Sequence, residues 1–502
     1  MKHYTIGIDI GTTAIKGVLL HRSGKAAAWA RFEQRQFYPQ PGWVEQDPEE
    51  LLELVCGVIR ELMDQAGIGA DQMIALGLDH QGESCLVWDS RTGKPLYPAI
   101  TWQDRRTSGT ADRYKQTIGA QVREKTGLTP DAYYSALKFR WLLDQIPGGK
   151  EMAADGRLLG GTLDTWIIWK LTGGKRFVTD VCSAGCTMLC DIHAGNWDHW
   201  LLDQFGIPRA MLPQILPCDG DFGVTEARYF GEPIPIRGVA PDGHMGMFGI
   251  DGVHPGTLTV TYGTGSFMHL VTGGRCVAPE NGLTASRCCS LREEKIYQLN
   301  GICYTAGTAV KWLQNGLGIL ENDKESAAIA RSVPDSGGVI FVPAFTGLAM
   351  PWWDQEARGA LLGLTAGVTR AHVIRAVLES LAAQVATNLE IMRESCPGEI
   401  SCIYALGGIT ANDFLMQYQA DLAGIPVIIP DQTEPCFGAA KLALISCLGE
   451  ACLAEFETET QNRVYYPTKD ETWRKNMLEV WNQGVARCLS ADVYRGQGTT
   501  FR

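Results

Sequence analysis

Residues 6–20 read Ile-Gly-Ile-Asp-Ile-Gly-Thr-Thr-Ala-Ile-Lys-Gly-Val-Leu-Leu, and this stretch decides the fold. The pattern predicts an apolar strand that runs into Asp9, a tight turn at Gly11–Thr13 and a second apolar strand. We expect Gly11 to adopt a positive φ and to let a ligand approach the bare backbone. Together with the turn hydroxyls and amides, the Lys16 ammonium and the Asp9 carboxylate suit a polyphosphate bound with a divalent cation. An ordinary β-hairpin with a glycine turn is the alternative, since short glycine motifs are weak signals.

A second strand–turn–strand stretch lies at the head of the C-terminal half. Residues 257–271 place the turn Gly263–Gly265 between two apolar strands. The two hairpins form a weak internal repeat, which suggests two related domains that grip one nucleotide between them. The turn-rich segment Gly249–Gly256 separates them. We therefore predict an N-terminal domain at 1–250 and a C-terminal domain at 251–502.

The composition is that of a globular protein with two sizeable domains, since 45% of the 502 residues are hydrophobic and 20% are charged. The net charge of -12 disfavours nucleic acid or an anionic membrane as a partner. No secretory apolar segment follows the first residues, and no apolar run of about 18 residues is present. We expect a cytoplasmic protein whose sixteen cysteines are reduced thiols. Because the chain has no CxxC pair, we do not expect a cysteine metal site.

Two polar segments predict the wall of a small-molecule pocket. The first, Asp79–Ser84, directly follows an apolar strand. The second, Ala99–Thr107, contains Trp102 and two arginines. As the alternative, Glu83 and Arg105 form a structural ion pair and Trp102 belongs to the core.

A carboxylate and a double glycine mark two further turns. Asp242 ends an apolar segment and opens a helical run rich in glycine and methionine. It is either a helix N-cap or a general base held on a fixed turn. Gly407 and Gly408 connect an apolar strand to a helix that starts near Asn412. They either let a flat or charged ligand approach, or only form a tight strand-to-helix turn.

Capping residues and apolar faces predict the main helices. Asp47 caps a helix that opens with proline. A second helix begins with Asp164 or Thr165 as its cap, and a long third helix begins at about Arg370. We expect the helix after Glu434 to complete the core of the second domain.

Seven of these stretches, taken in order, resemble the FGGY carbohydrate kinases of the actin–Hsp70–sugar-kinase superfamily. The resemblance runs from Tyr4 to about Gly449. The stretches are Asp9–Thr13, Tyr133–Gln145, Gly161–Trp166, Asp242, Tyr262–Gly265, Val342–Gly347 and Gly407–Asn412. The resemblance implies an α/β fold of two ribonuclease-H-like domains with a catalytic cleft between them.

The resemblance also implies roles for individual residues. Asp242 resembles the general base that takes the proton of the attacking hydroxyl, and Asp9 resembles the carboxylate that helps to hold Mg²⁺. The positions similar to nucleotide-binding residues are Thr12, Thr13, Lys16, Gly263, Thr264, Gly265, Gly307, Gly408 and Asn412. The positions similar to acceptor-pocket residues are Gln81, Gly82, Glu83, Trp102, Tyr133, Asp242, Gly243 and Phe267.

These roles imply a kinase that uses ATP and Mg²⁺ to phosphorylate a hydroxyl of a small polyol or sugar. The resemblance is compatible with a homodimer or a homotetramer. The alternatives are a non-catalytic sugar-sensing relative and an actin-like or Hsp70-like ATPase that acts as a binding module.

Two positions depart from the glycerol kinases of this family. Those enzymes carry an arginine at the position of Gly82 and usually a glutamine at the position of Gly243. Two long polar side chains are thus replaced by glycine, so a bidentate clamp is lost and we expect an enlarged pocket. The sequence therefore favours a longer polyol or a ketose as the acceptor, with glycerol itself as the alternative.

Overall fold

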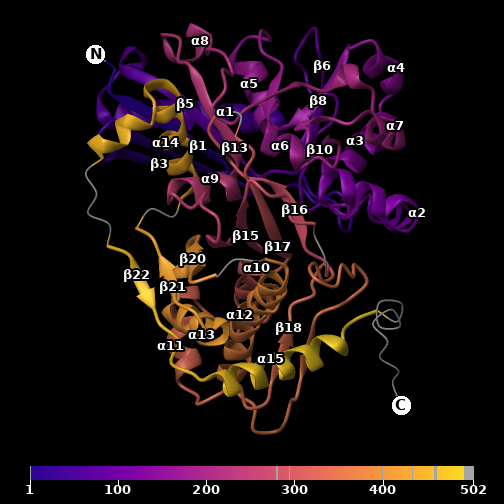
Figure 1. Ribbon diagram of the computed structural model, residues 1–502, viewed down its shortest axis with the longest axis vertical. Helices are drawn as coiled ribbons and strands as arrows, with labels where there is room; N and C mark the ends of the chain where they lie inside the picture. The colour runs from indigo at the N-terminus through magenta and orange to yellow at the C-terminus, as the bar shows by residue number, and fades with distance from the viewer. Residues whose placement is uncertain are drawn as a thin grey trace.

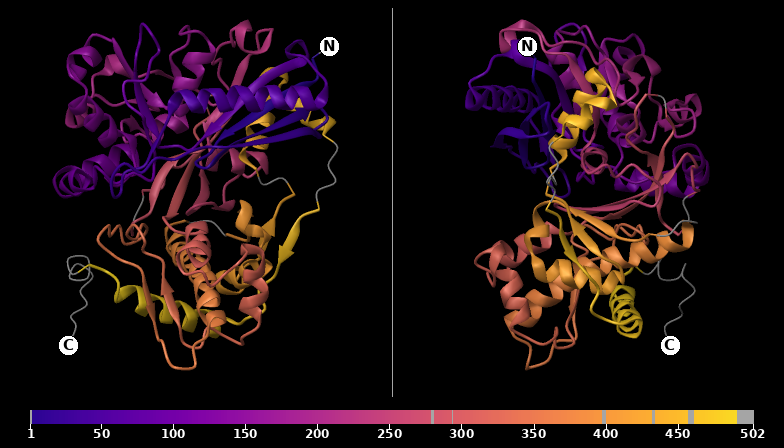
Figure 2. Two further views of the ribbon diagram at one scale, coloured as in Figure 1. Left: turned by 180° about the vertical axis from the view of Figure 1, so that it is seen from behind. Right: turned by 60° about the vertical axis from the view of Figure 1, so that its left-hand side comes forward.

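The computed structural model describes residues 2–278, 281–292, 294–396, 400–431, 434–456 and 461–490. Figure 1 shows two α/β bodies, one above the other, each built around its own twisted sheet, and Figure 2 shows the same division from two further sides. Within the described segments, no helix is both long and apolar enough to span a lipid bilayer.

The first sheet has five strands in the order β13-β5-β1-β2-β3. The strands are β1 (Tyr4–Ile10), β2 (Ala14–His21), β3 (Ala26–Glu33), β5 (Met73–His80) and β13 (Ile236–Pro241). The first three form an antiparallel meander that begins with the predicted hairpin, and β5 and β13 add in parallel beside β1. Helix α1 (Pro48–Ala66) begins where the sequence predicts, because the Asp47 side chain accepts a hydrogen bond from the Glu49 amide at 2.9 Å.

The second sheet repeats this arrangement. Its strands are β14 (Leu258–Tyr262), β15 (Ser266–Gly273), β16 (Thr284–Arg287), β17 (Tyr297–Cys303), β20 (Ile403–Leu406), β21 (Val427–Ile429) and β22 (Arg463–Tyr465). The order is β16-β17-β15-β14-β20-β21-β22, with β14, β15 and β17 antiparallel and β20 and β21 parallel beside β14. The shared strand order confirms the predicted α/β fold with two ribonuclease-H-like sheets.

The remaining elements are a third sheet, short strands and the helices around the two main sheets. A four-stranded sheet, β4-β7-β6-β8, combines Glu45–Gln46, Ala99–Ile100, Cys85–Asp89 and Leu158–Thr162. The helices of the first half are α2 (Ser108–Thr126), α3 (Ser135–Gln145), α4 (Gly149–Ala154), α5 (Leu163–Leu171), α6 (Val181–Gly185), α7 (His199–Phe205), α8 (Ala227–Phe230) and α9 (Asp242–Gly249). Those of the second half are α10 (Gly307–Lys311), α11 (Ser326–Arg331), α12 (Arg370–Ser395), α13 (Asp413–Ala423), α14 (Pro435–Leu448) and α15 (Glu471–Ala486). The short strands are β9 (Val178–Asp180), β10 (Cys190–Asp191), β11 (Asn196–Trp197), β12 (Gln214–Leu216), β18 (Ile340–Val342) and β19 (Ala360–Leu362).

Helix α14 corrects one prediction, because it does not complete the second core. The chain returns to the upper body, where α14 lies beside β1 (Figure 1). A Cβ atom added to Gly7 of β1 would stand 1.8 Å from the Cys436 carbonyl oxygen, and one added to Gly77 of β5 would stand 2.1 Å from that of Ala439. The two glycines therefore let the helix backbone lie directly on the first sheet.

The start of α5 corrects a second prediction. Thr162 occupies the N-cap position, so neither Asp164 nor Thr165 caps the helix. Asp164 is instead fully buried, where it accepts a hydrogen bond from the Thr179 hydroxyl at 2.8 Å and lies 3.2 Å from Nε2 of His80. It ties the end of β5 to β9.

The contact between α14 and the first sheet predicts a sharp stability effect. We expect Gly77→Ala to lower the free energy of unfolding by about 1–3 kcal/mol or more, because the added methyl would have to displace backbone rather than a side chain. The midpoint of urea unfolding measures this. Gly109→Ala in α2 is the matched control, since nothing lies within 4 Å of its Cβ position, and equal midpoints for the two variants would contradict the packing described.

Candidate active site

A cavity of about 880 Å³ is lined by residues from both sheets. It collects the residues that the sequence predicts for the two binding sites, with one exception. The predicted residues that line it are Asp9, Thr12, Thr13, Lys16, Gln81, Gly82, Glu83, Trp102, Tyr133, Asp242, Gly243, Gly263, Thr264, Phe267, Gly307, Gly408 and Asn412. The exception, Gly265, packs against β17, where a Cβ atom would stand 2.5 Å from the Cys303 carbonyl oxygen.

Three carboxylates gather at the floor of the cavity. Asp9 and Asp79 are register partners on the parallel strands β1 and β5, and Asp242 follows the adjacent strand β13. Burial raises the pKa of Asp9, and burial with the charge of Asp9 raises the pKa of Asp79 well above its ordinary value. Asp9 and Asp79 share a side-chain hydrogen bond, which lowers the pKa of Asp9 and raises that of Asp79. Apart from this bond, Oδ1 of Asp9 and both carboxylate oxygens of Asp79 have no hydrogen-bond partner among the described residues. Asp9 lines the cavity, and a carboxylate there suits a divalent cation such as Mg²⁺. The sequence analysis did not single out Asp79.

Asp242 is the first residue of α9 and is fixed by its own turn. Its Oδ1 accepts a hydrogen bond from the Gly243 amide at 2.7 Å. Burial, and then the charge of Asp9, raise the pKa of Asp242 to about 7. A carboxylate with this pKa is a stronger base than an ordinary aspartate, which suits a group that must take a proton from an alcohol.

The first glycine–threonine turn differs from expectation in two details. Gly11 does not have a positive φ; a Cβ atom there would stand 3.0 Å from the Ala14 carbonyl oxygen and 3.2 Å from Oδ1 of Asp9. Glycine is thus required by close approach and not by a left-handed backbone. Nζ of Lys16 lies 2.5 Å from Oε2 of Glu434 and 3.9 Å from Oδ2 of Asp9. Glu434, which the sequence analysis did not link to this site, therefore holds the ammonium in the cavity.

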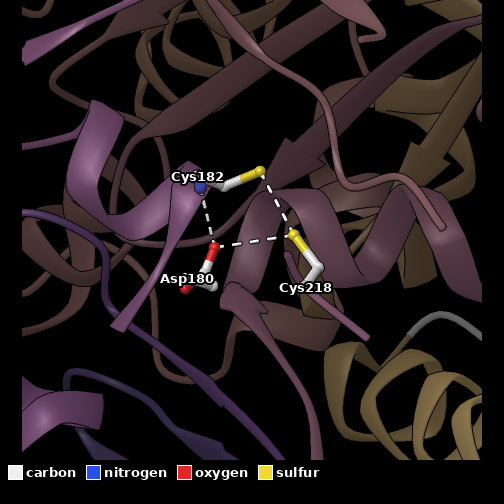
Figure 3. A group of neighbouring side chains, drawn as sticks. All are labelled: Asp180, Cys182 and Cys218. Carbon is white, nitrogen blue, oxygen red and sulfur yellow. Dashed lines mark hydrogen bonds between the residues drawn. The ribbon is translucent and has the colours of Figure 1, made fainter. Parts of the chain in front are cut away.

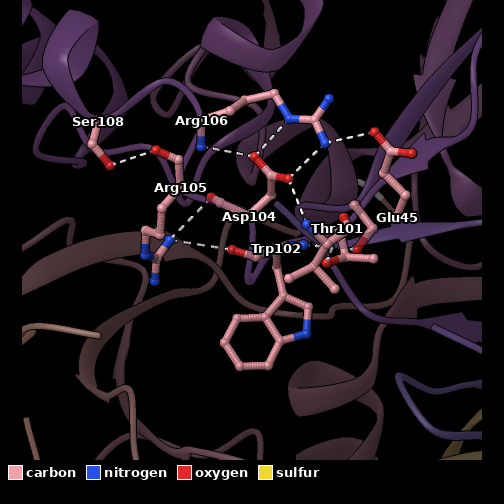
Figure 4. A network of polar contacts seen from close by, with 9 residues as sticks. Glu45, Thr101, Trp102, Asp104, Arg105, Arg106 and Ser108 are labelled. Atoms are coloured by element: carbon pink, nitrogen blue, oxygen red, sulfur yellow. Dashed lines mark hydrogen bonds and ion pairs between the residues drawn. The ribbon is translucent and has the colours of Figure 1, made fainter. Parts of the chain in front are cut away.

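Trp102 forms one wall of the cavity, and a network of ion pairs around Arg106 fixes the loop that carries it. Arg106 donates to Oδ2 of Asp104 and to Oε1 of Glu45, both at 2.8 Å, and its guanidinium lies 3.8 Å from the ring centroid of Trp43. Figure 4 shows this network on one side of the backbone and the indole of Trp102 projecting to the other. The indole N–H of Trp102 donates to the Thr12 hydroxyl at 3.0 Å. The wall and the first turn are therefore one rigid unit.

Glu83 also lines the cavity, and no ion pair between it and Arg105 is present among the described residues. The nearest carboxylate to Arg105 among the described ion pairs is Asp131 at 3.9 Å, and its guanidinium lies 4.4 Å from the Tyr304 ring centroid. The structural ion-pair alternative is therefore wrong. Burial raises the pKa of Glu83 to about 7, while the Tyr133 hydroxyl stabilises its charged form. A carboxylate that faces a polar cavity is suited to accept hydrogen bonds from hydroxyl groups.

The double glycine of the second half forms the predicted tight turn and leaves open space on the side of the cavity. Gly407 has φ of 92°, and a Cβ atom there would stand 2.3 Å from the Tyr262 carbonyl oxygen, so it makes the tight turn. No atom lies within 4 Å of the Cβ position of Gly408, which faces the cavity. Asn412 caps α13 through Oδ1, which accepts from the Leu415 amide, and its Nδ2 donates to the Ser326 hydroxyl, both at 2.9 Å.

The two unusual glycines do not leave equal space. At Gly82 a Cβ atom would stand 3.3 Å from the Cys186 sulfur, slightly tighter than ordinary van der Waals contact, so the thiol would have to shift by a few tenths of an ångström. At Gly243 it would stand 2.5 Å from Nε2 of His269. The place of a side chain at position 243 is thus taken by an imidazole. The expectation that this glycine enlarges the pocket is wrong for the side of Gly243 that His269 occupies.

Two cysteines far apart in sequence meet beside this region. The sulfurs of Cys182 and Cys218 lie 3.6 Å apart, and Cys218 lies 3.6 Å from Oδ1 of Asp180 (Figure 3). That oxygen also accepts hydrogen bonds from the amides of Cys182 and Ser183, at 2.8 and 3.1 Å. Asp180 is therefore the N-cap of α6, with two buried thiols packed against it.

Comparison with known proteins agrees with this geometry. Residues 4–249 match the model of the N-terminal domain of the FGGY family of carbohydrate kinases, and residues 258–447 match that of its C-terminal domain. The chain is 41% identical over 491 residues to a glycerol kinase of Pseudothermotoga lettingae, covering 97% of this chain and 98% of that one. It is 40% identical over 489 residues to glycerol kinase 2 of Thermotoga maritima, covering 97% of this chain and 99% of the other.

Solved structures give the same result. A Plasmodium falciparum glycerol kinase with ADP superposes with a TM-score of 0.85 at 29% identity, covering 97% of this chain and 98% of that chain. A xylulose kinase of Lactobacillus acidophilus superposes with a TM-score of 0.84 at 23% identity, covering 99% and 100%, and this likeness concerns the fold alone. With both halves matched by the family models and relatives near 41% identity over almost its full length, the chain belongs to the FGGY family of carbohydrate kinases.

Proposed function

We propose that the protein transfers the γ-phosphoryl group of ATP to a hydroxyl of a small polyol or sugar, with Asp242 as the general base. The observation that carries this proposal is the convergence of Asp242, Asp9 and the two glycine–threonine turns on one cavity. A non-catalytic sugar sensor would not need a buried base beside two further buried carboxylates. The carbohydrate-kinase family and a relative solved with ADP support the proposal.

The residues divide the task between them. The amides and hydroxyls at Thr12, Thr13 and Thr264 face the polyphosphate, and Lys16 offers a positive charge near Asp9. Mg²⁺, when bound, would neutralise charge on the transferred phosphoryl group, and Asp9 would help to hold it, with Asp79 directly behind.

Asp242 acts on the acceptor. It accepts the proton of the attacking hydroxyl, while Gly243 N–H holds one of its oxygens in place. Trp102, Tyr133 and Phe267 enclose the carbon chain: the rings of Tyr133 and Phe267 lie 5.9 and 5.6 Å from that of Trp102. This aromatic enclosure excludes water, which is the competing acceptor.

For the acceptor itself, we favour a linear polyol or ketose longer than glycerol. The support is the missing side chain at Gly82, which removes an arginine clamp from the wall next to Glu83. Glycerol is the second candidate, because the relatives near 41% identity are glycerol kinases.

A panel of acceptors tests this choice. We expect kcat/KM for erythritol, threitol, xylitol, ribitol, xylulose or ribulose to exceed that for glycerol, because glycerol finds no arginine clamp at Gly82. ADP release with MgATP is the measurement, and a no-acceptor reaction is the control. If glycerol gives the highest kcat/KM, the longer-acceptor proposal is wrong while the kinase proposal stands.

Removal of the base provides the second test. Asp242→Asn should lower kcat by roughly 10²- to 10⁴-fold, because the amide cannot take the proton. Nucleotide should still raise the Tm of this variant as it does for the wild type. A variant that retains most of its kcat would rule out Asp242 as the base.

Metal dependence provides the third test. Excess EDTA should abolish ADP release, and Asp9→Asn should raise the Mg²⁺ concentration needed for half-maximal activity, since one carboxylate of the site is lost. Cys447→Ser, an exposed position in α14, is the control. An unchanged Mg²⁺ requirement in the Asp9 variant would contradict its assignment.

A further inference from the structure

A histidine from the second sheet occupies the space beside the proposed base. His269 lies on β15, and its Nε2 is the atom nearest to the Cβ position of Gly243, at 2.5 Å, with both neighbouring ring carbons at 3.3 Å. Equal distances to the two carbons mean that the ring points end-on at Gly243. Only glycine at position 243 is compatible with this ring position, so Gly243 and His269 form a matched pair.

The far end of the ring is fixed by a polar ladder across three strands. Nδ1 of His269 lies 3.0 Å from Oδ1 of Asn300 and 3.0 Å from Nε2 of Gln298, both on β17. Asn300 in turn donates to the Ser286 hydroxyl on β16 at 3.0 Å. The ladder uses Nδ1 and holds the ring in one orientation, which directs Nε2 toward Gly243, the residue after the proposed base.

This leaves Nε2 of His269 with unused hydrogen-bonding capacity. Burial lowers the pKa of His269, so the ring is neutral and carries one donor and one acceptor. With Nδ1 engaged by the ladder, no described residue forms a hydrogen bond with Nε2, and His269 lines the cavity. A hydroxyl group both donates and accepts, so it fits either tautomer of the ring.

The adjacent histidine has a different role. Nε2 of His244 lies 2.9 Å from the Arg287 carbonyl oxygen, to which it donates. Gln298 lies 3.2 Å from the same nitrogen. His244 is therefore held by the protein at Nε2, and its Nδ1, which has no partner among the described residues, is buried. Nε2 of His269 instead lies at the Cβ position of Gly243 in the cavity wall.

We infer that His269 determines acceptor specificity by binding, through Nε2, a hydroxyl of the acceptor next to the one that Asp242 deprotonates. The imidazole occupies the position where a side chain at residue 243 would begin, and it reaches that position from the other sheet. This inference rests on the proposed kinase function. Because Phe267 lies two positions earlier on the same strand and face, one strand supplies both an apolar wall and a polar contact to the acceptor.

Substitution of the histidine is the first test. With the best acceptor of the panel and with glycerol, His269→Leu should raise the acceptor KM about tenfold, the scale of one lost hydrogen bond in a polar site, while the KM for ATP stays unchanged. His269→Gln, which keeps a polar end, should recover part of the loss. His254→Leu, at an exposed turn, is the matched control, and the Tm of each variant identifies any loss of folding.

Exchange of the pair is the second test, and it remains informative if His269→Leu is poorly stable. Gly243→Gln alone should lose most of its kcat/KM, because the new side chain meets the imidazole. Gly243→Gln combined with His269→Leu should recover activity and shift preference toward glycerol.

The outcomes separate the two proposals. If the wild type phosphorylates no member of the panel, the proposed function and this inference both fall. If the wild type is active but His269→Leu leaves the acceptor KM unchanged, or Gly243→Gln alone keeps full activity, the kinase function stands and the role of His269 is wrong.

Discussion

The structure depends on holding three carboxylates together at the ends of adjacent parallel strands. Asp9 of β1 lies opposite Asp79 of β5, and Asp242 directly follows β13, two residues beyond the register partner of Asp79. The charge of Asp9 raises the pKa of both Asp79 and Asp242. Burying like charges is costly unless a cation or a proton compensates. The rest of the fold must therefore fix the strands that carry these carboxylates. In a phosphoryl-transfer site the electrostatic cost of burying them is functional, because the same carboxylates bind the cation and accept the proton.

Helix α14 supplies this rigidity from the second half of the chain. The backbone of α14 lies on Gly7 and Gly77, each two residues before a carboxylate of the cluster. A Cβ atom on Gly438 of α14 would stand 2.0 Å from the Met245 carbonyl oxygen of α9. The helix therefore touches both the sheet that carries Asp9 and the helix that begins at Asp242. Since Glu434 precedes α14 and pairs with Lys16, the same connection places a second-half carboxylate in the first-half phosphate turn. The two halves of the chain therefore contact each other within the candidate active site, through the ion pair of Lys16 with Glu434.

The sequence predicts what is local and repeated. The hairpin at Asp9, its partner at Gly263 and the cap at Asp47 are short-range patterns, and the structure confirms the elements they predict. What the sequence could not show is long-range: that α14 returns to the first sheet, that Glu434 meets Lys16, and that Asp164 joins β5 to β9. Asp79 lies in one of the polar segments that the sequence analysis assigned to the pocket wall. Its role beside Asp9 follows from the pairing of β1 with β5, which places the two residues opposite each other. Gly265 follows the family pattern in sequence, and in the structure it lets the turn pack against β17.

The pair formed by Gly243 and His269 shows why a missing side chain does not translate into empty space. From the sequence alone, a glycine in place of a glutamine predicts a lost contact and a larger pocket. In the structure, a neighbouring side chain fills the space that the missing side chain would have used. Here that side chain is His269 of β15, whose Nδ1 is held by Asn300 and Gln298. The hydrogen-bonding group is then carried by the sheet opposite the base, so its distance from Asp242 depends on how the two bodies sit against each other. A glutamine at 243 would move with the base, whereas His269 moves with the nucleotide-side sheet. With the role inferred for His269, acceptor recognition would depend on the relative position of the two bodies, which a side chain next to the base would not require.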